Sequence, residues 1–191
     1  MRKPNEANKE KFIKSAVSEL EEHGVSGFSI RRVARKCGTS CAAPYKHFES
    51  RNALMLEVIR YIYKKWEAIQ KDTMELNAGC TLREKIVAIC TAYVTFLCTY
   101  PEYQTIIFMN DRVFPPEMLA EKVKLSAITG HLIDDYCQSV QMPEEVRRRK
   151  LFTAKSFLYG SAVMINSGAV PFNSETMEQI RQCINREFEI Q

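Results

Sequence analysis

The chain has 191 residues, of which 46% are hydrophobic, so its length suits one ordinary domain or a large domain with a small one attached. Its net charge of +4 is unevenly spread: residues 1–60 hold 12 Lys and Arg against 7 Asp and Glu, whereas residues 61–191 hold 15 against 16. This division is typical of a phosphate-binding part on a neutral body. The uncharged runs are either too short for a membrane span or interrupted by Gly, Asn and Pro, which excludes an integral membrane protein.

The seven cysteines are an odd number and form no Cys-x-x-Cys pair, and the first residues lack the pattern of a signal peptide. Cys37 and Cys41 are four residues apart, but Gly38 interrupts the helix between them and His47 lacks ligand spacing to either. We therefore expect a cytoplasmic protein with reduced thiols, no metal site and no cofactor.

Helical periodicity dominates the chain and strand alternation is almost absent, which predicts an all-α fold. A first helix ends at His23-Gly24 and carries one apolar stripe, formed by Phe12, Ile13, Ala16, Val17 and Leu20. Two short helices bent around Gly38 come next. The first runs from a Ser29 cap through Val33 and Ala34, and the second from a Ser40 cap through Tyr45 and Phe48. Arg and Lys lie on their open side, so the pattern is a helix-turn-helix and indicates DNA binding.

The rest of the chain predicts longer helices. One comes after residues 49–52 and ends before residues 77–79, and a second, over residues 81–99, is apolar on two faces and therefore buried on both. Beyond residue 100, prolines divide the chain into a short segment at 102–110 and helices at about 117–140, 144–167 and 174–189. We interpret residues 1–50 as a DNA-binding head, 51–76 as a connecting helix and 77–191 as a second domain.

The head resembles the DNA-binding domain of the tetracycline-repressor (TetR) family of bacterial regulators. The positions that carry the resemblance are Gly24, Phe28-Ser29, Arg31, Val33-Ala34, Gly38, Ser40, Tyr45, His47-Phe48, Arg51 and Ala53-Leu54. The form Ala42-Ala43-Pro44-Tyr45-x-His47-Phe48 occurs in one subset of that family. Thr39, where an aliphatic residue is usual, and Pro44, a helix breaker, are the two departures.

The resemblance implies a three-helix head plus a C-terminal helical domain for ligand binding and dimerisation, with about nine helices in all. It implies a homodimeric transcriptional regulator, a repressor that a small molecule releases from a palindromic operator. An enzyme is disfavoured, because no Gly-rich phosphate loop, metal-spaced His cluster or nucleophile elbow is present. The alternative is an all-helical protein-interaction module without specific DNA binding.

Small side chains at Cys41, Ala42 and Ala43 allow the backbone to approach base edges in the major groove. The resemblance places Arg31 at a guanine edge, and it makes phosphate contacts of Ser29, Ser40, Tyr45, Lys46, His47 and Arg51. Two alternatives stay open: Arg32, Arg35 and Lys36 keep an exposed helix soluble, and His47 packs under the first helix.

In the second domain, candidate ligand-binding residues are the aromatic and Met side chains of the buried helices: Tyr93, Phe96, Tyr100, Phe108, Met109 and Phe157. The candidate dimer interface lies on the last two helices and comprises Phe157, Gly160, Ser161, Met164, Met177, Ile180, Ile184 and Phe188. The alternative is that these stripes pack within the monomer.

Overall fold

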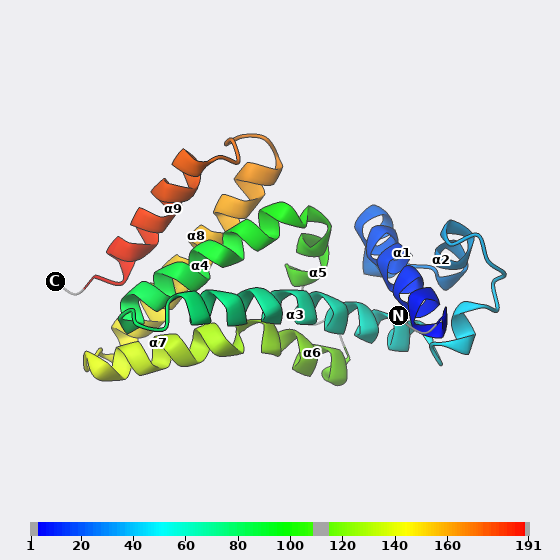
Figure 1. Cartoon of the computed structure of the whole chain (residues 1–191), viewed down its shortest axis with the longest axis horizontal. Helices are drawn as coiled ribbons and strands as arrows, with labels where there is room; N and C mark the ends of the chain where they lie inside the picture. Colours follow the sequence, from blue (N-terminus) through cyan, green and yellow to red (C-terminus); the bar gives the residue numbers. More distant parts are fainter. Residues whose placement is uncertain (1–3, 109–114, 190–191) are drawn as a thin grey trace. The chain divides into compact units, whose positions relative to one another are not determined.

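The structure is a computed structural model that describes residues 4–108 and 115–189 (Figure 1). Within these ranges the chain is helical and contains no strand, so the predicted all-α fold is confirmed. The α-helices are α1 (Pro4–Gly27), α2 (Ile30–Lys36), α3 (Arg51–Leu76), α4 (Leu82–Thr99), α5 (Gln104–Ile107), α6 (Pro116–Val123), α7 (Ala127–Ser139), α8 (Glu144–Asn166) and α9 (Ser174–Glu187). None of the described helices has the length and apolar character needed to cross a membrane.

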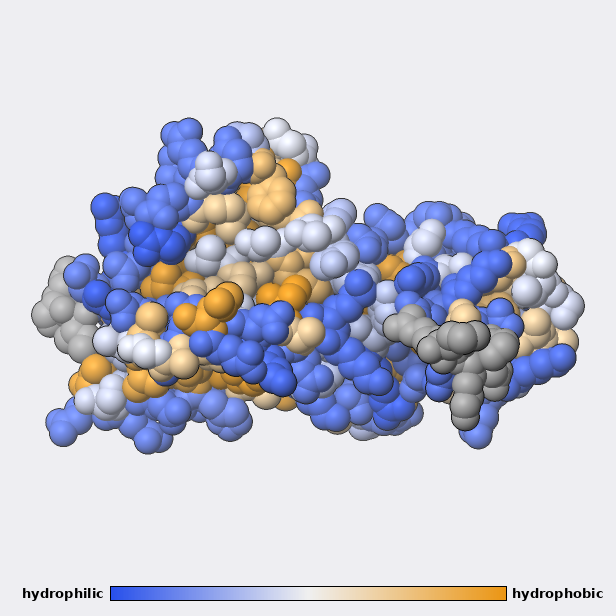
Figure 2. All heavy atoms as spheres, in the orientation of Figure 1, coloured by the Kyte–Doolittle hydropathy of each residue, from blue (hydrophilic) through white to orange (hydrophobic). Residues whose placement is uncertain are grey.

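The chain divides into two compact units. Unit 1 combines residues 1–65 with residues 102–124, and unit 2 combines residues 66–101 with residues 125–191. The α3 helix therefore contributes to both units, and the segment around α5 and α6 belongs with the head. On the face drawn in Figure 2, unit 2 shows more hydrophobic surface than the part built from α1 and α2.

The core of unit 1 includes the predicted apolar stripe of the first helix. Phe12, Ala16 and Leu20 are buried, together with Val33 of α2 and Leu54 of α3. The backbone of α1 breaks at Gly24, whose φ of 63° is the left-handed conformation that glycine adopts without strain. The predicted helix stop at His23-Gly24 is thus a kink, after which one more turn leads to α2.

The second helix of the predicted helix-turn-helix is not an α-helix. Residues 41–47 form turns around a short 3-10 helix, η1 (Pro44–Lys46), with N–H groups bonding three residues back, as from Ala43 to the Ser40 carbonyl and from His47 to that of Pro44. The cause is Pro44, which has no N–H to donate to the carbonyl of Ser40.

The core of unit 2 is organised around α4, which contacts α7, α8 and α9. A capping box starts this helix: the Thr81 side chain accepts from the Glu84 N–H, and the Glu84 carboxylate accepts from the Thr81 N–H. Both predicted apolar faces of α4 contain buried residues. Ile86 and Ile89 are buried on one face, and Val94 is buried on the other.

One predicted helix is two in the structure. The span 117–140 is interrupted by the 3-10 turn η4 (Lys124–Ser126), which separates α6 from α7. The break falls where the chain passes from one compact unit to the other. No proline or glycine marks it in the sequence, so apolar periodicity continues across it.

Candidate nucleic-acid interface

The α2 helix presents one buried and one open face. Ile30, Val33 and Ala34 are buried, whereas Arg31 and Arg35 are exposed. Ser29 occupies the position before the helix in an extended conformation, and its hydroxyl does not cap the first turn. Both arginines and the Ser29 hydroxyl are thus available to a partner on the open side.

The end of α2 is closed by a turn that needs Gly38. Its φ is 68°, and its N–H donates to the Arg35 carbonyl at 3.0 Å while the Thr39 N–H reaches the Ala34 carbonyl at 3.0 Å. The Thr39 hydroxyl donates to the same carbonyl at 3.2 Å. Thr39, a departure from the family pattern, therefore stabilises the turn by a hydrogen bond.

Small side chains line the segment after this turn. Thr39, Ser40, Cys41 and Ala42 are exposed, and Ala43 is half-buried. Pale, weakly polar surface lies at this α2 edge of the molecule in Figure 2. The predicted close approach of backbone to base edges is sterically open, although the backbone here forms turns rather than an α-helix.

The side chains of η1 and the residues after it divide into a buried set and an exposed set. Pro44 and Phe48 are buried and anchor the turn, whereas Tyr45 is 55% exposed and Lys46 is exposed. His47 is half-buried, with its ring centroid 5.7 Å from that of Phe12 in α1. The packing alternative for His47 agrees with this position, and Tyr45 and Lys46 are the η1 side chains that face solvent.

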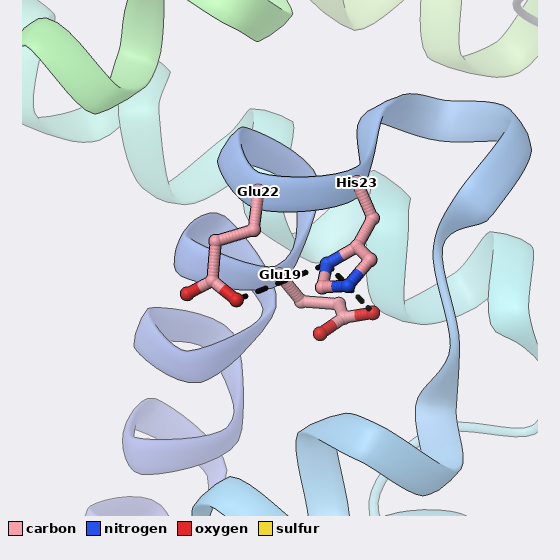
Figure 3. Close-up of side chains that lie close together, drawn as sticks. All are labelled: Glu19, Glu22 and His23. Carbon is pink, nitrogen blue, oxygen red and sulfur yellow. Dashed lines mark ion pairs between the residues drawn. The ribbon is translucent and has the colours of Figure 1, made fainter.

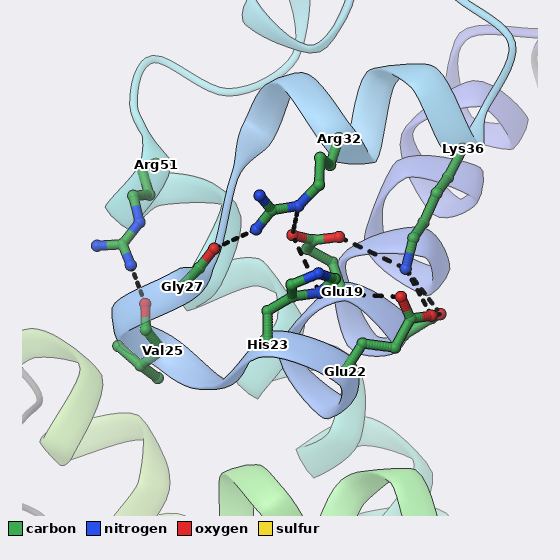
Figure 4. Close-up of polar contacts among 9 residues, drawn as sticks. Glu19, Glu22, His23, Val25, Gly27, Arg32, Lys36 and Arg51 are labelled. Atoms are coloured by element: carbon green, nitrogen blue, oxygen red, sulfur yellow. Dashed lines mark hydrogen bonds and ion pairs between the residues drawn. The ribbon is translucent and has the colours of Figure 1, made fainter.

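Two cations of α2 are bound by carboxylates of α1 (Figure 4). Arg32 Nε lies 2.5 Å from Glu19 Oε1, and Lys36 Nζ lies 2.7 Å from Glu22 Oε1 and 3.5 Å from Glu19 Oε2. Arg32 also donates to the carbonyl of Gly27. The hydrogen bond from Lys36, helped by one from Ser18, lowers the pKa of Glu22. Arg32 and Lys36 therefore fasten α2 to α1 and do more than keep the helix soluble.

The other cations of this surface are in a different situation. Within the part of the chain that the structure describes, Arg31, Arg35 and Lys46 form no ion pair. On α2, Arg32 and Lys36 are thus paired with α1, whereas the exposed Arg31 and Arg35, like the exposed Lys46 of η1, form no ion pair among the described residues. These three cations are therefore available to neutralise a negatively charged partner such as a phosphate backbone.

Glu19, Glu22 and His23 come together at the end of α1 (Figure 3). His23 Nδ1 lies 3.6 Å from Glu19 Oε1 and 3.8 Å from Glu22 Oε2. Two carboxylates and an imidazole can ligate a metal, but Arg32 and Lys36 already offset the two negative charges. A divalent cation would compete with both, so the arrangement favours an ion-pair network.

Arg51 is turned into the head. Its guanidinium donates to the Val25 carbonyl (Figure 4) and lies over the ring of Phe28, 5.5 Å from the centroid. The resemblance predicts that Arg51 contacts a phosphate. In the structure its side chain instead contacts the last turn of α1 and Phe28, and these contacts hold α3 against that segment.

The predicted ligand-binding residues do not gather in one place. A cleft of about 630 Å³ in unit 2 includes Phe96 and Tyr100, together with residues of α3, α4 and α9. Tyr93 and Phe157 do not line it, and Phe108 belongs to unit 1. Met109 lies outside the described residues.

The predicted dimer residues differ between the two helices. On α9, Ile180, Ile184 and the following Phe188 are buried within the chain, and Met177 is half-buried, as the packing alternative requires. On α8, Gly160 and Met164 are exposed, while Phe157 and Ser161 are half-buried. Phe152 and Val163, which the sequence pattern did not single out, are further exposed apolar residues of α8.

Sequence reasoning also missed Glu19. It lies three residues after Ala16 and seven after Phe12, hence on the apolar face of α1. A carboxylate at such a position is expected to be buried with a cationic partner, so the sequence could have predicted a buried ion pair at Glu19.

The head of unit 1 matches a known family of DNA-binding domains. Residues 12–58 match the family model described as bacterial regulatory proteins, tetR family. The match runs from within α1 into α3 and includes α2 and η1.

Solved structures of similar fold agree. A TetR family transcription regulator from Marinobacter aquaeolei VT8 has a TM-score of 0.78 and 20% identity, with 98% of each chain covered. The fatty acid degradation regulator FadR from Bacillus halodurans has a TM-score of 0.73 and 10% identity over 98% of this chain and 96% of that one. The regulator FadR from Bacillus subtilis, solved with stearoyl-CoA, has a TM-score of 0.70 and 12% identity over 94% and 96%. No curated protein matches the chain significantly.

Residues 12–58 thus match a DNA-binding domain of the TetR type, which makes the chain a DNA-binding transcriptional regulator, and its fold is similar to that of TetR-family regulators.

Proposed function

We propose that this regulator is a homodimeric bacterial repressor, acting in the cytoplasm, that binds a palindromic operator and releases it when a small molecule binds unit 2. The observation that carries the proposal is that the head exposes three cations, Arg31, Arg35 and Lys46, and between them in the sequence the small residues from Thr39 to Ala42. This combination gives attraction to phosphates and close access to base edges.

Each candidate side chain of the head has a proposed role. Arg31 reads a guanine through its two-pronged donor group, while Cys41, Ala42 and Ala43 let the backbone approach the bases. The phosphate contacts come from Ser29, Ser40, Tyr45 and Lys46. His47 and Arg51, both half-buried, act by positioning η1 and α3, because the imidazole ring packs near Phe12 and the guanidinium packs over Phe28.

A dimer is proposed because one head offers few contacts, and two heads at a fixed spacing read two half-sites. The exposed apolar residues of α8, among them Phe152, Val163 and Met164, supply a surface for a second copy. The outward residues of α9 are mainly polar, so α8 contributes the larger apolar part.

The effector is proposed to bind in unit 2. Its cleft of about 630 Å³ lies within the size range of small-molecule sites and has apolar, aromatic and threonine side chains along its walls. The stearoyl-CoA in the structure of the Bacillus subtilis FadR is a precedent for a small-molecule effector in this fold.

Selection of bound sequences from random DNA tests the function. An enriched palindrome supports the head, the dimer and their symmetry together, whereas a protein-interaction module would enrich no site. Binding to the selected DNA should also weaken steeply as salt rises, because each phosphate contact releases counterions.

Arg31→Ala tests the reading of a base. We expect it to lose about 1–3 kcal/mol of discrimination between the selected site and random DNA. Arg35→Ala is the matched control, since this neighbouring cation is expected to weaken both bindings alike and to lower the salt slope by about 1. Unchanged discrimination in Arg31→Ala would contradict the assigned role.

A further inference from the structure

Gln70, in the part of α3 that belongs to unit 2, is a fully buried amide. Its side chain is 0% exposed, and neither Nε2 nor Oε1 has a hydrogen-bond partner among the described residues. Two donor hydrogens and one acceptor oxygen are therefore held away from water without a described protein group to bond.

Its neighbour on the same face of α3 is in the opposite situation. Trp66 lies one helical turn before Gln70 and is 1% exposed, yet its Nε1 donates to the Leu125 carbonyl at 2.8 Å. Its ring packs against those of Tyr93 and Phe96 in α4, at centroid distances of 5.0 and 5.3 Å. The interior of unit 2 thus satisfies a polar group beside Gln70, while the described residues leave the amide itself unsatisfied.

An unsatisfied amide destabilises a fold, whereas an apolar side chain of similar length would fill the same position without that cost. Packing therefore does not account for glutamine at this position. A ligand that binds after folding and has a group that both donates and accepts a hydrogen bond would account for the glutamine.

The cleft of unit 2 brings such a group within reach. It is lined by Ile69 and Thr73, the residue before Gln70 and the residue one turn after it on α3, and by Phe96, which packs on Trp66. The amide is thus a neighbour, on the helix surface, of side chains that form the cleft wall. Gln70 itself does not line the cleft, so a ligand reaches it only when a wall side chain turns to another rotamer.

The cleft wall offers few free donors of its own. The hydroxyls of its four threonines donate to carbonyls of their own helices: Thr73 to Ile69, Thr91 to Val87, Thr95 to Thr91 and Thr99 to Thr95. Asn77 Nδ2 donates to the Thr73 carbonyl, and Arg181 is held by Glu178. Glu84, which is bonded to Thr81, and Asn185 are further polar lining residues. An apolar ligand body suits the walls formed by the threonine and apolar side chains, and its polar head finds a buried complement at Gln70.

We propose that the Gln70 amide recognises the head of an amphiphilic effector whose apolar body lies in the α3–α4–α9 cleft and whose head, a carboxamide or a protonated carboxyl, both donates and accepts a hydrogen bond. This proposal rests on the proposed function, because it assigns the effector site of the repressor. The two hydrogen bonds formed satisfy the amide oxygen and one of the two donor hydrogens, so binding stabilises unit 2.

The test uses two probes of equal chain length on the full chain. Decanamide has a head that donates and accepts, whereas the head of methyl decanoate only accepts. We expect decanamide to bind wild type at least tenfold more tightly, measured by titration and by the rise of the urea unfolding midpoint. We expect Gln70→Leu to fold, to have a higher midpoint without ligand, and to lose the preference for decanamide. Gln138→Leu, a change at an exposed position of α7, should keep the preference.

Equal binding of the two probes to wild type, or an unchanged preference in Gln70→Leu, overturns the proposal. So does a lower midpoint of Gln70→Leu, because the amide would then have a stabilising partner. DNA binding measured on the same preparations separates the two proposals. Salt-dependent DNA binding without a decanamide preference contradicts the Gln70 site alone, whereas the preference without DNA binding supports the site and contradicts the repressor.

Discussion

Glu19 in the head and Gln70 in unit 2 are both 0% exposed, but their polar surroundings differ. Glu19 forms ion pairs with Arg32 and Lys36, although its Oε2 has no hydrogen-bond partner among the described residues, whereas both polar atoms of the Gln70 amide lack one. The buried carboxylate holds two helices together, as a rigid DNA-reading platform requires. The buried amide keeps its hydrogen-bonding capacity for a later partner, as an effector site requires.

The largest change in the free energy of unfolding is expected at Trp66, one helical turn before Gln70. Trp66→Phe leaves the Leu125 carbonyl without its donor and removes part of a packed ring, so we expect a loss of about 2–4 kcal/mol in the free energy of unfolding. The measurement is urea denaturation followed by circular dichroism. Gln70→Leu, one turn away, is the matched variant and should gain about 1 kcal/mol. Losses of equal size in both variants would remove the contrast between the two positions.

The second effect concerns the head. Glu19→Gln removes the charge that holds Arg32 and Lys36, and these cations are partly exposed, so we expect a cost of about 1–3 kcal/mol in unfolding free energy. Because α2 loses its fastening to α1, DNA affinity should fall as well. Glu21→Gln, an exposed neighbour, is the control and should change neither quantity. If both variants retained wild-type stability, the network would not be structural.

The smallest effect concerns Glu57 of α3. Burial opposes its ionisation, but hydrogen bonds from Lys9 of α1, at 2.6 Å, and from Arg60 outweigh burial and lower its pKa below the usual 4.5. Its contribution is therefore present above about pH 4.5 and is lost as the pH falls through the lower folded-state pKa. We expect Glu57→Gln to cost about 0.5–1 kcal/mol at pH 7.

The cost of Glu57→Gln should shrink towards zero as the pH is lowered below the folded-state pKa. Urea midpoints measured across the acid range check this, with Glu49→Gln, an exposed residue just before the same helix, as the control. A cost that stays constant down to low pH would mean that the effect is not electrostatic.

The helices could largely be predicted from local patterns. The α4 helix starts at a Thr81 capping box and ends before Pro101, and its two apolar faces are buried. Gly24 and Gly38 have positive φ where the pattern predicted breaks. The short helix predicted after Ser40 is present only as the 3-10 helix η1, because one missing N–H at Pro44 outweighs the helical pattern around it.

The sites could be predicted only in part. Exposure of Arg31, Tyr45 and Lys46 agrees with their proposed roles, whereas Arg51 and His47 pack within the head. The apolar stripe of α9 could be predicted from the sequence, but the surface that it packs against could not. A stripe such as Ile180 and Ile184 has the same spacing whether it faces its own chain or a second copy.

By itself, the sequence determined the helical class, most helix ends and the family of the head, because these depend on residues a few positions apart. The tertiary structure alone decided which buried polar groups are paired. Glu19 meets cations 13 and 17 positions later in the chain, and Gln70 meets no polar partner among the described residues. Pairing depends on which side chains the fold brings within about 3 Å, and local sequence patterns do not encode that distance.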